Sequence, residues 1–258
     1  MKQDVLEFAA RQTADGKKVA LVTVTGTHGS SPASPGQFMA VLSDGSSVGT
    51  VGGGASEHRL IKQAAEAIKS GTVVFSFSFD HSEDGMVCGG GMEGFGNILG
   101  SRAGLVIFGG GHIAQSLAKI AVSTGFFVTV IEDRAEFAAA FDGVRYVTCA
   151  PSDYETNDVL ADAGYAVVCT RGHRTDSDAL RYCLTKPLKY LGMIGSVKKV
   201  SELLANMRDR GVPQEALDCV YAPIGLDIAK EAPGEIAVAI LAEILLVKNN
   251  GKLMHKRS

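Results

Sequence analysis

The sequence has few of the features that mark secreted, membrane-bound or zinc-stabilised proteins. Its five cysteines are an odd number and include no C-x-x-C pair, which disfavours a disulfide framework and a zinc ribbon. The first residues contain no apolar segment of the kind that directs secretion. The longest apolar stretch, residues 236–247, is too short to cross a bilayer and contains Glu243. These absences predict a cytoplasmic protein with no membrane partner.

Excess positive charge and recognisable catalytic motifs are also lacking. The formal net charge is −3, which disfavours nucleic acid as the main partner. The histidines are scattered and form no H-x-x-x-H or E-x-x-H pair on a predicted helix. A G-x-S-x-G elbow between a strand and a helix, which would carry a hydrolase nucleophile, is absent as well, since the one match to this pattern, residues 45–49, falls in a predicted hairpin. The sequence thus predicts neither a histidine-based metal site nor a hydrolase of that type.

What is present divides the chain into two parts. In residues 1–100, hydrophobic periodicity predicts a smaller α+β domain. Its expected helices cover 1–16 and the segment from Gly54 to Gly71, and its expected strands cover 18–25, 38–42, 46–51 and 73–79. The glycine-rich segment 80–102 is predicted to be irregular and to contain the domain boundary.

From residue 101 on, the pattern changes to alternating strands and helices. Strand-like runs end near Phe108, Ile131, Val147, Cys169 and Met193, with helical segments between them. Such alternation predicts βαβ units and a parallel sheet. The last helix is expected to begin at Pro233, because proline suits the first helical turn. The predicted fold class is therefore α/β, with a Rossmann-like parallel-sheet domain over residues 101–258.

The most informative motif follows the strand predicted at residues 105–108. Gly109, Gly111 and Ala114 form the G-x-G-x-x-A pattern between a strand and a helix, which is typical of dinucleotide binding. Gly109 permits the tight turn and Gly111 lets a phosphate approach the backbone, while the N–H groups from His112 onward face the anion. A plain turn between a strand and a helix is the alternative.

The next predicted strand ends in a charged pair. Asp133 can accept a hydrogen bond from a ribose hydroxyl, or it can cap a helix. Arg134 can bind a phosphate or form a surface ion pair. The sequence alone does not decide between these roles.

Two further loops follow predicted strands at the same sheet edge, where open sheets bind ligands. The first loop carries Arg171, His173 and Asp176, which suit an anionic ligand, although Asp176 can also cap the next helix. The second loop carries Gly195 and Ser196, and Ser196 is also a good helix cap. These loops are expected to converge on one crevice that holds a phosphate-bearing ligand.

The N-terminal part has three candidate segments of its own. Ser30 lies in a loop rich in hydroxyl groups, and Gly53 and Gly54 precede a helix whose N–H groups can face an anion. Cys88 lies in a glycine loop, where backbone dipoles can lower the pKa of an accessible thiol. A lone cysteine that packs as a small hydrophobic residue is the alternative.

Taken together, these segments resemble the xanthine dehydrogenase accessory factor family (XdhC/CoxI type) over residues 18–247. The matching motifs, in chain order, are residues 29–32, 35–36, 39, 49–54, 57, 88–90, 109–112, 133–134, 170–176, 192–196, 223–227, 235–237 and 242–244. Several motifs in one order are far more specific than any one of them.

The resemblance implies a cytoplasmic chaperone for the molybdenum cofactor, the molybdopterin form of molybdenum. Such a protein binds and protects the cofactor, assists its sulfuration and delivers it to an apo molybdenum hydroxylase such as xanthine dehydrogenase. A cysteine desulfurase is a further implied partner, and a homodimer is the implied assembly. This is an accessory role rather than that of an enzyme, and the sequence leaves catalytic turnover open. The predicted cofactor-binding residues are Ser30, Gly53, Gly54, Cys88, Gly109, Gly111, His112, Asp133, Arg134, Arg171, His173, Asp176, Gly195 and Ser196.

Two departures from the family pattern bear on this prediction. Glu132 stands where a second aspartate is expected, and Gly54-Ala55 stands where some members carry a cysteine. Cys88 is then the one candidate for contact with the cofactor's molybdenum or sulfur. Two other functions stay open, an NAD(P)-dependent oxidoreductase and a regulator that senses a nucleotide. The client enzyme, and the choice between a mononucleotide and a dinucleotide pterin, are not fixed by the sequence.

Overall fold

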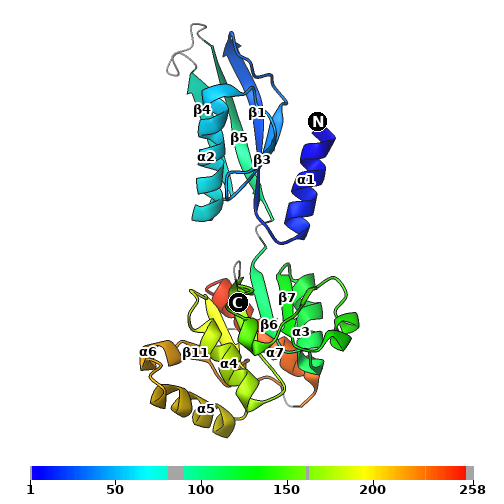
Figure 1. Cartoon of the computed structure of the whole chain (residues 1–258), viewed down its shortest axis with the longest axis vertical. Helices are drawn as coiled ribbons and strands as arrows, with labels where there is room; N and C mark the ends of the chain where they lie inside the picture. Colours follow the sequence, from blue (N-terminus) through cyan, green and yellow to red (C-terminus); the bar gives the residue numbers. More distant parts are fainter. Residues whose placement is uncertain (1, 81–89, 101, 161–162, 230, 254–258) are drawn as a thin grey trace, which may run out of the picture. The chain divides into compact units, whose positions relative to one another are not determined.

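The computed structural model describes residues 2–80, 90–100, 102–160, 163–229 and 231–253. The chain divides into two compact units, residues 1–101 and 102–258 (Figure 1). Each unit is built around one β-sheet, antiparallel in the first unit and parallel in the second.

The N-terminal unit is a five-stranded antiparallel sheet with a helix on each face. Its elements are α1 (Lys2–Ala14), β1 (Val19–Gly29), β2 (Phe38–Leu42), β3 (Ser47–Gly49), α2 (Gly54–Ser70), β4 (Val74–Asp80) and β5 (Gly90–Leu99). The strand order is β3-β2-β1-β5-β4. Successive side chains of a strand point to opposite faces, so Val22 and Val24 pack with α2 whereas Val19 packs with α1.

Strand β5 shows that the prediction of an irregular segment over residues 80–102 was wrong for residues 90–99. β5 pairs with both β1 and β4. A Cβ on Gly94 would lie 2.0 Å from the carbonyl oxygen of Thr23 and 2.7 Å from the ring of Phe77, and one on Gly96 would lie 2.3 Å from the ring of Phe75. The glycines are therefore there to let aromatic rings lie against the strand, and they do not mark turns.

The C-terminal unit is a six-stranded parallel sheet between two layers of helices. Its elements are β6 (Gly104–Phe108), α3 (His112–Ser123), β7 (Phe127–Glu132), η2 (Ala135–Ala140), β8 (Arg145–Thr148), η3 (Pro151–Asp153), β9 (Ala163–Val168), α4 (His173–Cys183), β10 (Tyr190–Met193), α5 (Val197–Asp209), α6 (Gln214–Leu217), β11 (Val220–Tyr221) and α7 (Pro233–Lys248). The strand order is β11-β10-β9-β6-β7-β8, which is the order of dinucleotide-binding Rossmann domains. The predicted fold class and the start of the last helix are confirmed. The five predicted strand ends are correct to within one residue, whereas β11 was not predicted.

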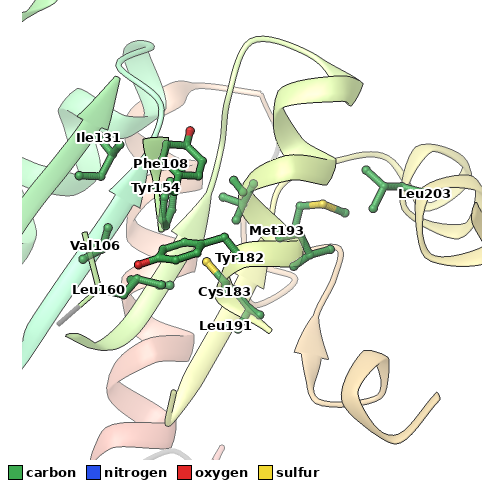
Figure 2. Packing of buried hydrophobic residues seen from close by; sticks show 14 of the residues in the cluster. Val106, Phe108, Ile131, Tyr154, Leu160, Tyr182, Cys183, Leu191, Met193 and Leu203 are labelled. Carbon is green, nitrogen blue, oxygen red and sulfur yellow. The ribbon is translucent and has the colours of Figure 1, made fainter. Parts of the chain in front are cut away.

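An aromatic cluster fixes the end of β6 (Figure 2). Phe108, the last residue of this strand, makes a T-shaped contact with Tyr154 at 5.1 Å between ring centroids. Tyr182 of α4 lies against both rings, with centroid distances of 6.5 Å and 5.8 Å. This packing holds the strand end from which the glycine turn starts.

The opposite face of the parallel sheet is covered by α3 and α7. The apolar helix α7 buries Ala237, Ile240 and Ile244 in the same core as Leu117 of α3. Its low polarity is therefore explained by packing within the unit. In the described parts of the chain, no helix is long and apolar enough to cross a membrane.

Candidate functional site

The loops after β6 and β9 form a crevice at the carboxyl edge of the parallel sheet. These two strands are neighbours at the point where the strand order reverses, and open α/β sheets bind ligands there. The crevice is lined by Gly109, Ile131, Glu132, Asp133, Pro151, Tyr154, Thr170, Arg171 and Thr175. Three of the predicted binding residues thus line one crevice: Gly109, Asp133 and Arg171.

Gly109 allows the two loops to approach each other. Its φ is +118°, a conformation that favours glycine, and its N–H donates to the carbonyl oxygen of Ile131 at 2.9 Å. A Cβ at this position would lie 2.3 Å from the carbonyl oxygen of Cys169. The first glycine of the fingerprint is therefore required by the close approach of the β9 end.

Gly111 leaves space at the start of α3. It is the N-cap residue of α3 and has no side chain with which to cap the first N–H groups of the helix. Among the described residues, no atom lies within 4 Å of the position that a Cβ would take on Gly111. His112, the first residue of α3, is exposed. The turn thus combines backbone donors with room for an anion.

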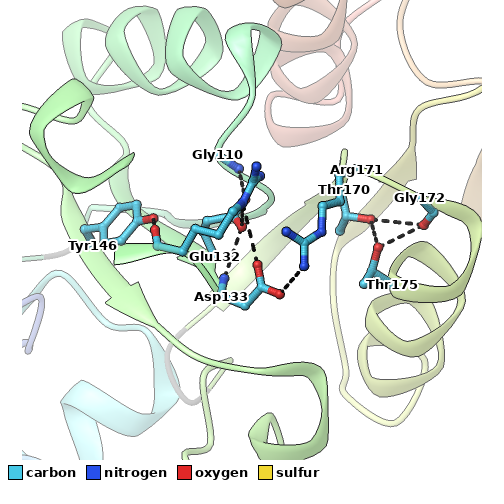
Figure 3. A network of polar contacts seen from close by, with 9 residues as sticks. Gly110, Glu132, Asp133, Tyr146, Thr170, Arg171, Gly172 and Thr175 are labelled. Carbon is cyan, nitrogen blue, oxygen red and sulfur yellow. Dashed lines mark hydrogen bonds and ion pairs between the residues drawn. The ribbon is translucent and has the colours of Figure 1, made fainter. Parts of the chain in front are cut away.

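The carboxylate of Glu132 binds the backbone of the glycine turn that follows β6 (Figure 3). It accepts the N–H of Gly110 at 2.7 Å, and Arg134 donates to its two oxygens at 2.8 Å and 3.0 Å. Its side chain is 4% exposed. Burial alone raises the pKa of Glu132, but the hydrogen bonds from Arg134, Asp133 and Gly110 outweigh burial and lower the pKa to about 2.

Glu132 was not among the predicted site residues, although its place at the end of the second Rossmann strand could have indicated it. The structure also places Arg134 in an ion pair, which is one of its two predicted roles. The guanidinium of Arg134 lies 4.1 Å from the centroid of the Phe137 ring while it binds Glu132.

An ion pair spans the crevice from β7 to the loop after β9. Nη2 of Arg171 lies 2.6 Å from Oδ2 of Asp133, and the two side chains are 53% and 28% exposed (Figure 3). The contact with Glu132 and partial burial raise the pKa of Asp133, and the charge of Arg171 acts in the opposite direction. The two predicted residues therefore contact each other in the structure.

Asp176 holds the loop after β9 in place by accepting hydrogen bonds from Thr170. Its side chain is fully buried, and its Oδ1 accepts from the backbone N–H of Thr170 at 3.2 Å and from the Thr170 hydroxyl at 2.6 Å. Its Oδ2 lies 2.6 Å from Nζ of Lys199. Asp176 thus acts on the crevice by positioning Thr170, and Lys199 supplies the compensating charge. Lys199 was not a predicted site residue.

The loop after β10 lies beside this buried pair. Ser196 is the N-cap of α5 and accepts the N–H of Lys199 at 3.3 Å, as the capping alternative predicts. A Cβ on Gly195 would lie 3.2 Å from the Lys199 side chain. His173 lines a groove between α4 and α5, together with Arg174. Gly195, Ser196 and His173 are not among the residues that line the crevice.

In the N-terminal unit, the predicted segments meet at one end of the sheet. A Cβ on Gly90 would lie 2.2 Å from the carbonyl oxygen of Ser30, and one on Gly52 would lie 3.0 Å from the backbone nitrogen of Ala33. The helix α2 that follows Gly53 begins at Gly54. Cys88 lies outside the described residues.

The N–H groups of this N-terminal glycine turn are bound by a carboxylate of the chain itself. Glu57, in the first turn of α2, accepts the N–H of Val51 at 2.9 Å and that of Gly53 at 3.1 Å. It also accepts the Thr50 hydroxyl at 2.5 Å.

Two of the four described thiols of the C-terminal unit, those of Cys169 and Cys183, are poor candidates for ligation at neutral pH. Burial raises the pKa of Cys169 to about 12 and also raises the pKa of Cys183. Both thiols therefore stay protonated. Within the described ranges, no group of three or more His, Cys, Asp or Glu residues could hold a metal ion.

Comparisons with known proteins identify relatives of this chain. The chain is 31% identical over 266 residues to the uncharacterised protein YqeB of Escherichia coli, covering 99% of this chain and 48% of YqeB. It is 29% identical over 144 residues to a probable subunit of xanthine dehydrogenase from Bacillus subtilis, covering 55% of this chain and 42% of that protein. The chain thus spans about half the length of these relatives, or less.

A solved structure and two family models complete the comparison. A crystal structure of a xanthine dehydrogenase from Bacillus halodurans matches with a TM-score of 0.51 at 20% identity, over 96% of both chains, and shows the same fold. The model of the XdhC Rossmann domain matches residues 105–244, and that of the XdhC and CoxI family matches residues 12–78. The chain therefore belongs to the XdhC family.

Proposed function

We propose that this chain binds the molybdenum cofactor, protects it, and assists its sulfuration and insertion into a xanthine dehydrogenase-like enzyme. Membership of the XdhC family supports a role in the maturation of xanthine dehydrogenase. The observation that carries the proposal for binding is the crevice between the loops after β6 and β9, because the glycine turn that leads into α3 and the guanidinium of Arg171 both offer donors to a phosphate at this edge of the sheet.

The residues of the crevice fit the phosphate end of a phosphorylated pterin. The backbone N–H groups at the start of α3 and the guanidinium of Arg171 are donors of the kind that bind phosphate. The cofactor, when bound, supplies the molybdenum centre of the client enzyme. The chain's own residues hold the phosphate at this edge of the sheet, and Asp176 positions Thr170 beside it.

The finer parts of the proposal rest on the family resemblance. They are a contact of Cys88 with the molybdenum or its sulfur, a cysteine desulfurase as sulfur source, a homodimer, and a cytoplasmic location. Ser30 lies against Gly90, the first residue of β5, and Gly52, next to Gly53, lies against Ala33. Replacing Cys88 with alanine tests the thiol. Normal binding and delivery of the cofactor by this variant would exclude a role for the thiol.

Retention of the pterin tests the proposal directly. The full chain is purified from a host that makes the cofactor, and the bound pterin is oxidised to its fluorescent form and quantified. We expect Arg171→Gln to lower the retained pterin by about tenfold, because a charge-assisted hydrogen bond to phosphate is lost. Arg145→Gln is the matched control, since Arg145 is the first residue of β8 and the crevice lies at the other, carboxyl ends of the strands. Co-purification of NAD(H) without pterin would contradict the proposal and favour an oxidoreductase or a nucleotide sensor.

A further inference from the structure

Strand β4 is the longest of the four edge strands in the part of the chain that the structure describes (Figure 1). It has 7 residues, whereas β8 has 4, β3 has 3 and β11 has 2. Natural sheets protect such edges with proline, lysine, a bulge or a covering segment. β4 contains neither proline nor lysine, and its register with β5 runs from Val74 to Asp80 without a shift. Within the described residues, this edge is therefore suited to pairing with a further strand.

The backbone groups of alternate β4 residues point away from the sheet. The N–H of Ile98 in β5 donates to the carbonyl oxygen of Val73 at 2.8 Å, so Val73 and every second residue after it direct their backbone groups toward β5. Ser76 and Ser78 consequently direct theirs to the outside. The side chain of Gln63 in α2 agrees with this direction, because its Nε2 donates to the carbonyl oxygen of Ser76 at 3.3 Å. The outward groups are the donors and acceptors that a further strand needs.

The sequence of β4 reads the same in both directions about Phe77. Residues 75–79 are Phe-Ser-Phe-Ser-Phe. Antiparallel pairing of two copies about a two-fold axis at Phe77 therefore places phenylalanine opposite phenylalanine, and Ser76 of each copy opposite Ser78 of the other. Directly opposite side chains are neighbours in an antiparallel pair, and aromatic pairs and hydroxyl pairs stabilise it. A second copy of this chain thus matches the edge along its length.

The charge and the exposed apolar side chains of this edge also suit a second copy. β4 carries one charged residue, Asp80, which the same register places opposite Val74 and not opposite another carboxylate. On this face of the sheet, α1 packs against β1 and β2, through residues such as Val19 and Ala40. Val74 is 58% exposed. A strand paired with β4 lies beside Val74 and removes part of its apolar surface from water.

We infer that two copies of this chain pair through their β4 edges and join their five-stranded sheets into one continuous antiparallel sheet. The N–H and C=O groups of Ser76 and Ser78 form the new ladder, and the two α2 helices lie on one face of the joined sheet. The contact uses the same surface on both copies, so the assembly closes at two. A homodimer is part of the proposed function, whereas the contact surface assigned to it rests on the strand itself.

Proline substitutions at two edge strands of the same sheet test this contact. The mass of the full chain is measured by analytical ultracentrifugation from about 1 to about 100 μM, and we expect a dimer of twice the chain mass of 27.0 kDa. Ser76→Pro removes an outward N–H in both copies and places a ring against the partner strand, so the dissociation constant should rise by at least about tenfold. Proline at an outward position of an edge strand removes no hydrogen bond within the sheet, so the fold should be retained.

Ser47→Pro is the matched control in β3, the other edge strand of this sheet. The N–H of Leu42 donates to the carbonyl oxygen of Ser46, so the N–H of Ser47 points outward as that of Ser76 does. We expect Ser47→Pro to leave the dissociation constant unchanged. Circular dichroism and thermal unfolding of both variants confirm that they are folded.

Charge pairs test the register of the two strands. Ser76→Lys combined with Ser78→Lys places lysine opposite lysine at two symmetric positions, whereas Ser76→Asp combined with Ser78→Lys places opposite charges there. Both serines are exposed, so either double variant should fold. At low salt, we expect the dissociation constant of the first double variant to exceed that of the second by about tenfold or more.

Three results would overturn the inference. They are a chain that stays monomeric over the whole concentration range, a dimer that Ser76→Pro and Ser47→Pro affect equally, and equal dissociation constants for the two double variants. The measurement in the unmodified chain needs no variant to fold. Because it involves no pterin, its failure is distinct from failure of the pterin retention experiment. A dimer that behaves as expected but retains no pterin would contradict the proposed function alone.

Discussion

The two units each contain a glycine turn that leads into a helix, and in both turns a glutamate binds the backbone. In the N-terminal unit, Glu57 comes from the helix that the turn precedes and accepts the N–H groups of Val51 and Gly53. In the C-terminal unit, Glu132 comes from the neighbouring strand and accepts the N–H of Gly110. The first turn is thus completed by its own helix, as in a capped helix start.

The second turn depends on residues far away in the sequence. Glu132 ties it to Arg134, and Gly109 packs against the end of β9. A glycine-rich segment before a helix can therefore form a locally complete cap or part of a crevice. What decides between them is the origin of the carboxylate and the presence of a neighbouring strand end.

The largest difference between the turns is expected from the substitution of one glycine in each. Gly109→Ala places a Cβ 2.3 Å from a backbone oxygen at a φ of +118°, so we expect the free energy of unfolding to fall by about 4 kcal/mol. Gly53→Ala also meets a positive φ, +77°, but no described atom lies within 4 Å of its Cβ. We expect Gly53→Ala to lower the free energy of unfolding by about 1 kcal/mol. Urea unfolding followed by circular dichroism measures both, and equal costs would refute the distinction.

Removing the carboxylates of Glu132 and Glu57 is expected to have the next largest effect on the free energy of unfolding. Glu132→Ala leaves a buried N–H and an arginine without their acceptor, which costs about 3 kcal/mol. Glu57→Ala removes hydrogen bonds to a helix start and costs about 1–2 kcal/mol. The same unfolding experiment compares them. If Glu57→Ala proved the more damaging, the coupling of the second turn to its surroundings would be unimportant.

The dependence of stability on pH tests the role of Glu132 in the second turn. The pKa of Glu132 is about 2 in the folded chain against an ordinary value of 4.5. A lowered pKa stabilises the fold above the ordinary value, and this contribution is lost as the pH falls through the lowered one. The melting temperature should therefore fall between about pH 4.5 and about pH 2, and it should fall less steeply in Glu132→Gln. Glu57→Gln serves as the matched control. Parallel profiles for wild type and Glu132→Gln would contradict the assignment.

Much of the C-terminal unit could be predicted because its signals are local. Apolar runs and the spacing of Gly109, Gly111 and Ala114 predicted the strand ends and the glycine turn. The pairing of Asp133 with Arg171 could not be predicted, because it joins residues 38 positions apart through the strand order. The buried pair of Asp176 and Lys199 escaped prediction for the same reason, since it joins two helices.

Glycine was the least reliable predictor of local structure, because a glycine can either permit a turn or make room for an atom from another part of the chain. In residues 90–99, glycines accommodate aromatic rings and the backbones of neighbouring segments within a paired strand, whereas Gly109 accommodates the backbone after β9 within a turn. Neither neighbour is visible in the local sequence. The difference between a turn and a crowded strand therefore emerges only from the tertiary structure.

Gly111 gives the smallest expected effect on stability and a direct test of the proposed phosphate position at the start of α3. Its φ is −70°, which any residue adopts, and within the described residues its Cβ position is clear of other atoms to 4 Å. Gly111→Ala should therefore change the free energy of unfolding by no more than about 0.5 kcal/mol. The added methyl group occupies the space that we assign to the phosphate, so retained pterin should fall by about tenfold. Full retention in a stably folded Gly111→Ala chain would show that the phosphate binds elsewhere, and the second glycine turn would then resemble the first.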